Sequence, residues 1–279
     1  MQNRKVMNKK SILLLARARE KMKELSKHPV LSKYWHKISL VLKGSVSRGN
    51  ADRYSDIDLV VYSSQKVKKS MISGYRAQGL TERTDGVFIH FNNGHYNLES
   101  YESLGACFSK KDFARCWDIE HSILLTDAGG RFARIVKEGR RKLFQNKTEI
   151  VKRAYLDIQL DLDWMRMPVA RADRVAVFLH AAKIVQGLSR IAYLLDGRSY
   201  PPDKWVAKYI PSTSWGRANA GLLKKYIENC DNLNALAANK PFAENPIYKD
   251  AGFLVSKVSG FIRRTHGKLP WIDKWYNYV

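Results

Sequence analysis

Two aspartates alternate within an apolar run of the sequence, Asp56-Ile-Asp-Leu-Val-Val-Tyr62. In a β-strand, residues two apart point to the same face, so Asp56 and Asp58 should project side by side while Ile57 and Leu59 face a core. Two neighbouring carboxylates repel each other unless a cation lies between them. Because Mg²⁺ prefers carboxylate and phosphate oxygens, this pair predicts a magnesium site that also takes phosphates.

A glycine–serine pair follows the preceding apolar run, which ends at Lys43. Gly44 allows a sharp turn and a close approach of the backbone to a ligand. Ser45 can open a short helix whose free N–H groups attract phosphate. Arg48, one turn further along, can add a forked cation to the same oxygens. Phosphate held beside a carboxylate-bound metal is the arrangement of a nucleotidyl-transfer site.

The segment Gly44-Ser45…Arg48-Gly49…Tyr54-Ser55-Asp56-Ile57-Asp58-Leu59 resembles the signature of the DNA polymerase β-like nucleotidyltransferase superfamily. Within that superfamily it is most similar to the small kanamycin-nucleotidyltransferase-type enzymes. The resemblance implies an α+β fold, in which a mixed-sheet nucleotidyltransferase domain is followed by an all-α helical-bundle domain. It also implies two Mg²⁺ ions, with Mn²⁺ as an alternative, and an NTP substrate, for which ATP is favoured. The competing interpretation is a strand–turn–helix whose aspartates are merely solvated.

The resemblance implies a third acid on a neighbouring strand. Two β-rich runs, 85–91 and 95–101, are joined by Asn92-Asn93-Gly94, a strong hairpin signal. Glu99 is the acid in the middle of the second run, and we predict it as the third metal ligand or as the base for the attacking hydroxyl. Glu102 is its rival, because a one-residue bulge would shift the pairing. The alternative for Glu99 is an exposed strand residue without a catalytic role.

The seven histidines show no ligand cluster in the sequence. His90 and His95 flank the hairpin turn, and we predict hydrogen-bonded or surface roles for them rather than metal binding.

A sheet and its helices must position these residues. The patterns predict a helix over the first 27 residues and then, in order, a strand at 38–43, a short helix from Ser45, a strand at 56–62, a helix at 64–78, a hairpin at 86–101, a helix at 109–118, a strand at 121–126 and a basic helix at 131–145. Composition then becomes helical. We therefore predict a catalytic domain over residues 1–145 and a helical, acceptor-binding domain over 146–279.

The helical part begins with a predicted helix from Thr148 to Met167, ended by Pro168, and a longer one from Ala170 to Leu195. Two or three further helices should follow.

The run from Tyr193 to Trp205 resembles the helix–Pro–Lys-Trp element in the helical domain of several of these small enzymes. The resemblance would place Lys204 over the triphosphate, whereas a plain helix-start lysine is the alternative. A helical-domain acid serves as base in some similar enzymes, which makes Asp161 a reserve candidate; a solvated helix face is its other interpretation.

Composition limits the class of protein. With 279 residues and 45% hydrophobic side chains, the chain is long enough for two modest domains. No run approaches about 20 apolar residues, so neither a membrane span nor a membrane partner is predicted. Three cysteines without metal-type spacing are typical of reduced thiols, which favours a cytoplasmic location.

Charge bears on the acceptor. The formal net charge is +23, and residues 1–43 contain twelve basic side chains against two acids, while residues 131–153 contain nine against two. Such a field attracts polyanions and repels cationic ligands. An RNA acceptor, such as a tRNA 3′ end, or an acidic protein that becomes adenylylated is therefore favoured.

Three alternatives remain. The resemblance alone implies a small acceptor of the antibiotic type, such as an aminoglycoside or a lincosamide. The basic surface alone could serve solubility. A catalytically weak RNA-binding module is disfavoured, because clustered acids gain nothing from facing a polyanion.

Overall fold

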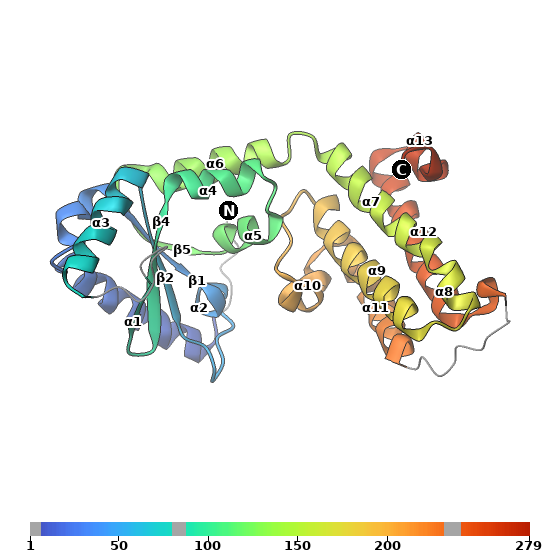
Figure 1. The fold of residues 1–279 in the computed structure, drawn as a ribbon, viewed down its shortest axis with the longest axis horizontal. Coiled ribbons are helices and arrows are strands. Elements are labelled where there is room, and N and C mark those ends of the chain that lie inside the picture. The colour runs from blue at the N-terminus through green and yellow to red at the C-terminus, as the bar shows by residue number, and fades with distance from the viewer. Residues whose placement is uncertain (1–6, 80–87, 232–240) are drawn as a thin grey trace. The chain divides into compact units, whose positions relative to one another are not determined.

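The computed structural model describes residues 7–79, 88–231 and 241–279. The chain divides into two compact units, Met1–Leu143 and Phe144–Val279 (Figure 1). The boundary expected from composition falls between residues 145 and 146.

The first unit contains a five-stranded sheet with the order β3-β4-β2-β1-β5. Its strands are β1 (Ser39–Lys43), β2 (Ile57–Ser63), β3 (Phe88–Phe91), β4 (Gly94–Ser100) and β5 (Ile123–Asp127). The β2–β4 pair is parallel and the other three pairs are antiparallel. The sheet is therefore mixed, which confirms the predicted α+β class. The β3–β4 pair is the hairpin predicted at 86–101, of which residues 86 and 87 lie outside the described part of the chain.

One face of the sheet packs on a hydrophobic core. Ile57, Leu59 and Val61 of β2 are buried there against α1 (Lys9–Ser26) and α3 (Gln65–Ala77). Because side chains alternate along a strand, Asp58 projects from the opposite face, as the sequence pattern predicted. The burial of β2 thus fixes the direction in which its aspartate points.

The other helical segments of this unit are η1 (Ser32–Lys37), α2 (Gly44–Arg48), α4 (Tyr101–Ser109), α5 (Phe113–Glu120), η2 (Ala128–Gly130) and α6 (Arg131–Leu143). The single helix predicted at 109–118 is wrong, because two helices occupy 101–120. Ser100 ends β4 and caps α4 at once, its hydroxyl accepting a hydrogen bond from the Ser103 N–H at 3.0 Å. A strand that passes directly into a helix leaves no loop signal in the sequence.

The described residues of the second unit form helices without a strand. They are α7 (Lys147–Trp164), α8 (Arg166–Ala170), α9 (Arg174–Leu195), α10 (Asp203–Tyr209), η3 (Ile210–Ser212), α11 (Ser214–Asp231), η5 (Phe242–Glu244), α12 (Pro246–His266), α13 (Pro270–Asp273) and η6 (Trp275–Asn277). Pro168 does not directly end α7, which already stops at Trp164, and it lies inside the first turn of α8. Proline is tolerated there, because first-turn N–H groups have no intrahelical partner.

The helix α9 is the one helix of the described chain that has the length and hydropathy to cross a membrane, with a mean hydropathy of 1.3 over its best window. Its apolar stripe, which includes Ile184, Leu188 and Ile191, is fully buried. The helix contacts α7, α11 and α12. These features are typical of the central helix of a bundle.

Candidate active site

Asp56 and Asp58 lie at the N-terminal end of β2. Asp56 ends the loop before the strand and Asp58 is the second strand residue. The side chain of Asp56 is 53% exposed and that of Asp58 is 34% exposed. Both carboxylates can therefore reach a ligand from solvent.

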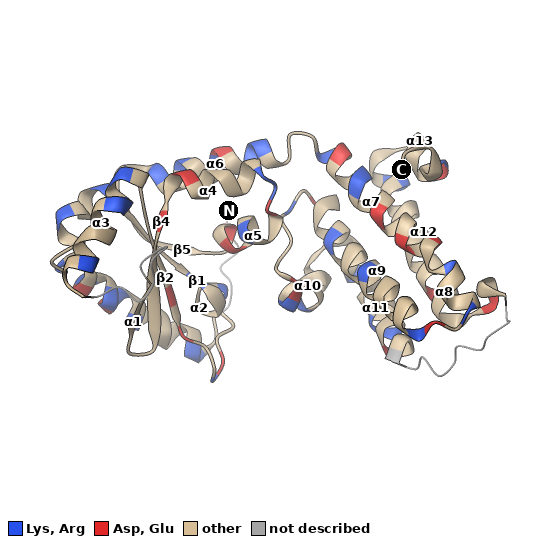
Figure 2. Cartoon of the chain, viewed as in Figure 1, with Lys and Arg blue, Asp and Glu red and all other residues tan. Residues whose placement is uncertain are grey.

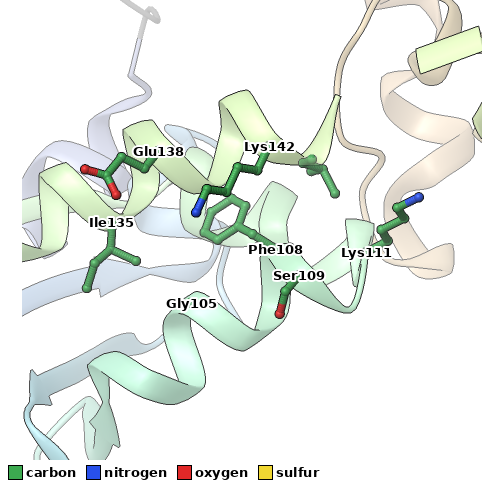
Figure 3. Close-up of a pocket in the computed structure, with 9 residues that line it drawn as sticks. Gly105, Phe108, Ser109, Lys111, Ile135, Glu138 and Lys142 are labelled. Carbon is green, nitrogen blue, oxygen red and sulfur yellow. The ribbon is translucent and has the colours of Figure 1, made fainter. Parts of the chain in front are cut away.

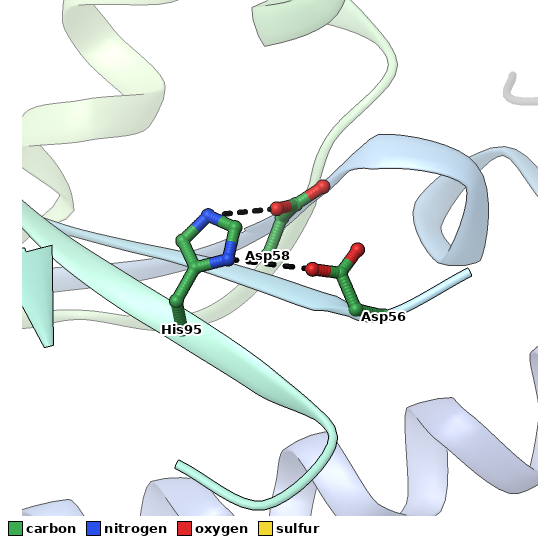
Figure 4. A group of neighbouring side chains, drawn as sticks. All are labelled: Asp56, Asp58 and His95. Carbon is green, nitrogen blue, oxygen red and sulfur yellow. Dashed lines mark ion pairs between the residues drawn. The ribbon is translucent and has the colours of Figure 1, made fainter. Parts of the chain in front are cut away.

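His95 joins the two aspartates. The parallel β2–β4 register sets it directly beside Asp58. Its Nε2 lies 2.9 Å from Asp58 Oδ1, and its Nδ1 lies 3.4 Å from Asp56 Oδ2 (Figure 4). One ligand atom from each of the three residues lies within 4.8 Å of the others, which makes them a group able to hold a metal ion.

The prediction of a hydrogen-bonded or surface role for His95 did not place it beside the two aspartates. Its position depends on the register between β2 and β4, which the periodicity of either strand does not contain. The available signal was the Asn-Asn-Gly turn, because it fixes where β4 begins.

The hairpin turn is tied to the start of β2. The Ile57 N–H donates to the Asn93 carbonyl at 2.9 Å. A Cβ on Gly94 would lie 2.3 Å from the Ile57 carbonyl oxygen, so only glycine permits this approach of β4 to β2. The ring of Phe88 stacks on that of His95, with centroids 4.4 Å apart. These contacts hold the imidazole over the aspartates.

Electrostatics at the pair follow from burial and like charge. Burial raises the pKa of the Asp58 carboxyl above its ordinary value, and the negative charge of Asp56 raises it further. The charges of His95 and Lys43 oppose that rise. A divalent cation would satisfy both carboxylates at once, which is the fit expected of a metal site.

Gly44 brings the glycine–serine bend against the same carboxylate. Its φ of +75° lies in the left-handed region, and a Cβ there would come within 2.3 Å of Asp58 Oδ2. The bend between β1 and α2 is therefore in contact with the aspartate, as a site for a metal-bound phosphate requires. The Ser45 hydroxyl makes no hydrogen bond to another residue of the described chain.

The first helix holds the loop that carries the motif. The Asn8 side chain caps α1 and donates to the Ala51 carbonyl at 2.8 Å. The Ala51 N–H in turn donates to the buried Ser11 hydroxyl at 2.9 Å. The chain between α2 and Asp56 is thereby anchored to α1.

Arg48 is directed into the protein. Its side chain is 5% exposed, and Nη1 lies 3.3 Å from Asp118 Oδ1 on α5. The guanidinium also lies over the ring of Trp117, 5.3 Å from its centroid. This geometry makes Arg48 a link between α2 and α5. Its phosphate-gripping role stays a prediction.

The structure does not bring Glu99 to the aspartate pair. Glu99 lies opposite Tyr62 in the β2–β4 register, four positions along β4 from His95. At ~3.3 Å per residue this is about 13 Å along the strand. Its carboxylate accepts a hydrogen bond from the Ser103 hydroxyl at 2.9 Å and lies 3.5 Å from Arg115. The residue beside Asp58 on β4 is His95 and not Glu99.

Glu102 is not a strand residue. It lies in the first turn of α4, and its Oε2 accepts a hydrogen bond from the Gln65 N–H at 3.1 Å. The bulge that would have made it a rival of Glu99 is absent, because β4 ends at Ser100.

Two predicted residues belong to the second unit. Lys204 is exposed in the first turn of α10. Asp161 of α7 accepts a hydrogen bond from Nδ1 of His180 at 3.0 Å and lies 3.7 Å from Lys183. The roles of Lys204 at the triphosphate and of Asp161 as base stay predictions.

A separate cavity of about 360 Å³ lies between α4 and α6 (Figure 3). Phe108 and Ser109 line it from one helix, and Glu138 and Lys142 from the other. None of the predicted site residues is among its lining residues.

Comparisons with known proteins bear on the first unit. Residues 15–122 match the family of the nucleotidyltransferase domain, a match that includes the glycine–serine bend, both aspartates and His95. A comparison with curated proteins finds no match. A solved structure of a nucleotidyltransferase-like protein from Exiguobacterium sibiricum is similar to this chain, with a TM-score of 0.48 and 11% identity over 88% of this chain and 78% of that one.

The family match confirms the resemblance that residues 44–59 carry, and it extends that resemblance over most of the first unit. Residues 15–122 are thus similar to the nucleotidyltransferase domain, and this match supports a transferase.

Proposed function

We propose that the protein transfers a nucleoside monophosphate from an NTP, with ATP favoured, to a hydroxyl of an acceptor. The acceptor oxygen forms a bond to the α-phosphorus, the bond from that phosphorus to the β-phosphate oxygen breaks, and pyrophosphate leaves. The hydroxyl proton passes to a general base.

The observation that carries the proposal is the contact between the Gly44 bend and the Asp58 carboxylate. A phosphate at the bend and a cation at the aspartates would be neighbours. Positioning and charge neutralisation are the main requirements of phosphoryl transfer, and a cation at Asp58 beside a phosphate at the bend would supply both.

We assign a divalent cation, Mg²⁺ or Mn²⁺, to Asp56 and Asp58. When bound, such an ion would offset the negative charge that develops on the leaving pyrophosphate. The chain's own residues orient the reactants: the two carboxylates fix the position of the ion, and the Gly44–Ser45 backbone faces the phosphates.

The acceptor that we propose is RNA, such as a tRNA 3′ end. Lys and Arg recur along α3 and α6 of the first unit (Figure 2). On α6, Arg134, Lys137 and Arg141 are exposed at helical spacing that puts them on one stripe. Such a stripe fits the phosphate backbone of RNA and disfavours a polycationic aminoglycoside.

The purified protein should be incubated with Mg²⁺, cell extract and each of the four α-³²P-labelled NTPs. We expect label in the RNA fraction, whereas γ-labelled NTPs should leave no label on the acceptor. Label in a small-molecule or protein fraction would keep the transfer chemistry and replace the acceptor. Absence of label from every fraction would contradict the proposed function.

Asp56→Asn and Asp58→Asn remove the charge and keep the shape of each side chain. We expect each variant to lower transfer by about 10³-fold or more, since charge stabilisation in the transition state is lost. Glu24→Gln on the exposed face of α1 is the matched control and should retain full activity. Activity retained in both aspartate variants would refute the metal assignment.

A further inference from the structure

We propose that His95 is a metal ligand, and that its imidazole makes this site select a transition-metal ion such as Mn²⁺ over Mg²⁺. The inference rests on the proposed function, because it concerns the cation assigned there to Asp56 and Asp58.

The first argument is distance. In an octahedral site with bonds of about 2.1 Å, adjacent ligand atoms are roughly 3 Å apart and opposite ones about 4.2 Å. His95 Nε2 lies 2.9 Å from Asp58 Oδ1. One atom each from Asp56, Asp58 and His95 falls within 4.8 Å of the others. The three side chains thus need only small shifts to surround one ion.

The second argument is rigidity. The His95 side chain is 22% exposed, and Phe88 stacks on the ring at an interplanar angle of 24°. The strand register places it next to Asp58, and the hydrogen bond between Ile57 and Asn93 ties the hairpin turn to the start of β2. A side chain held in this way loses little freedom when it binds an ion.

The third argument is the donor set. The acid expected to complete the site, Glu99, lies further along β4 and contacts Ser103 and Arg115. The cluster therefore offers two carboxylates and one imidazole. Mg²⁺ favours a shell of oxygens, whereas imidazole is a good ligand for first-row transition metals.

One other role fits the same contacts. A charged imidazolium would act as a counter-cation for both carboxylates and would compete with any metal ion. The two roles predict opposite effects of removing the ring: loss of a ligand weakens metal binding, and loss of a competitor strengthens it.

Mn²⁺ alone provides the test. Its binding to the full-length protein should be measured by the EPR signal of free Mn²⁺, and Mg²⁺ affinity by competition against bound Mn²⁺. Pulsed EPR of the bound ion reports whether a ¹⁴N nucleus is directly coordinated. The variants are His95→Ala, His95→Asp and, as a matched control on the neighbouring strand, His90→Ala. Circular dichroism and urea unfolding establish that each variant is folded.

We expect ¹⁴N coupling in the wild type and in His90→Ala, and its loss in His95→Ala. Mn²⁺ affinity should fall by at least about tenfold in His95→Ala. In His95→Asp, the preference for Mn²⁺ over Mg²⁺ should fall by at least about tenfold, because a carboxylate replaces the imidazole.

A wild-type Mn²⁺ complex without ¹⁴N coupling overturns the inference, as does unchanged or tighter Mn²⁺ binding in His95→Ala. These outcomes are distinct from failure of the proposed function. Nucleotidyl transfer by a protein whose metal site has no nitrogen ligand would contradict only the inference about His95. Nitrogen-ligated Mn²⁺ in a protein that labels no acceptor would contradict only the proposed function.

Discussion

Gly44 is subject to two separate constraints at the residue scale. Its φ is positive, and the place of a Cβ is already filled by the Asp58 carboxylate. We predict that Gly44→Ala lowers the free energy of unfolding by about 2 kcal/mol or more, since backbone strain and a clash add. Urea unfolding measures this loss. Transfer activity should fall as well, because the displaced carboxylate is a proposed metal ligand.

Gly105 in α4 is the control for that substitution. A Cβ there would meet nothing within 4 Å. Gly105→Ala in the helix should therefore be neutral or stabilise the protein by up to about 1 kcal/mol. Equal losses in both variants would contradict the constraint assigned to Gly44.

The cysteines give a prediction about reactivity. All three are buried, and burial raises the pKa of Cys107 and raises that of Cys116 to about 12. At pH 8 only about 10⁻⁴ of Cys116 would then be thiolate, the reactive form. We expect the native protein to react with Ellman's reagent only over hours, and three thiols to react at once in denaturant. Rapid reaction of the native protein would show that these residues are accessible.

Single residues differ in how far the sequence determines them. The i, i+2 spacing of Asp56 and Asp58 within an apolar run was sufficient to place both carboxylates on the same side of the chain at the start of β2, although β2 begins only at Ile57. The position of His95 depends on the register between β2 and β4. Glu99 was predicted beside the aspartates because this register is a feature of the tertiary structure that the sequence of β4 alone does not contain. The buried partner of Arg48 likewise lies 70 residues away in the chain.

At the scale of elements, the link between α2 and α5 depends on the pair of Arg48 and Asp118. The guanidinium is buried, so removing its partner leaves a charge with less compensation. We predict that Asp118→Ala lowers the free energy of unfolding by about 1–3 kcal/mol. Urea unfolding with a fluorescence signal is the measurement, for which Trp117 is a suitable neighbouring probe.

An exposed ion pair is the comparison for that loss. Lys21 and Glu24 are paired at 2.7 Å on the surface of α1. Glu24→Ala should cost no more than about 0.5 kcal/mol, because surface pairs contribute little. A loss at Asp118 as small as that at Glu24 would mean that the α2–α5 link is not energetically important.

Elements with a strong period were predictable, and junctions were not. The strands β1 and β2 and the helix α3 lie close to their expected bounds, because apolar periodicity and the Ser64 cap agree there. The helix α1 ends near its expected bound but begins only at Lys9. The direct passage from β4 into α4 carried no turn signal. Pro168 indicated that a helix ends nearby, but α7 ends at Trp164 and the proline itself belongs to α8.

At the scale of the whole molecule, charge is the dominant property. The net charge of +23 is concentrated in residues 1–43 and 131–153. On α6, Arg131 and Arg140 lie near Glu102 and Glu120, at 3.9 Å in each case. The stripe of Arg134, Lys137 and Arg141 is left exposed to solvent. It is the part of the charge best placed to meet a polyanion.

Salt dependence tests that assignment. Binding of a tRNA-sized RNA should weaken by about 10³-fold between about 50 and about 200 mM salt if six or more phosphates are neutralised. Replacing Arg134, Lys137 and Arg141 by Gln should lower the slope of log K against log salt by about 2, since each lost contact removes about 0.7–0.9. Lys249, Lys257 and Arg264 of α12, replaced by Gln, form the control of equal charge and should change the slope little. Equal slopes in both triple variants would contradict an RNA contact on α6, and a flat profile in the wild type would contradict an RNA acceptor.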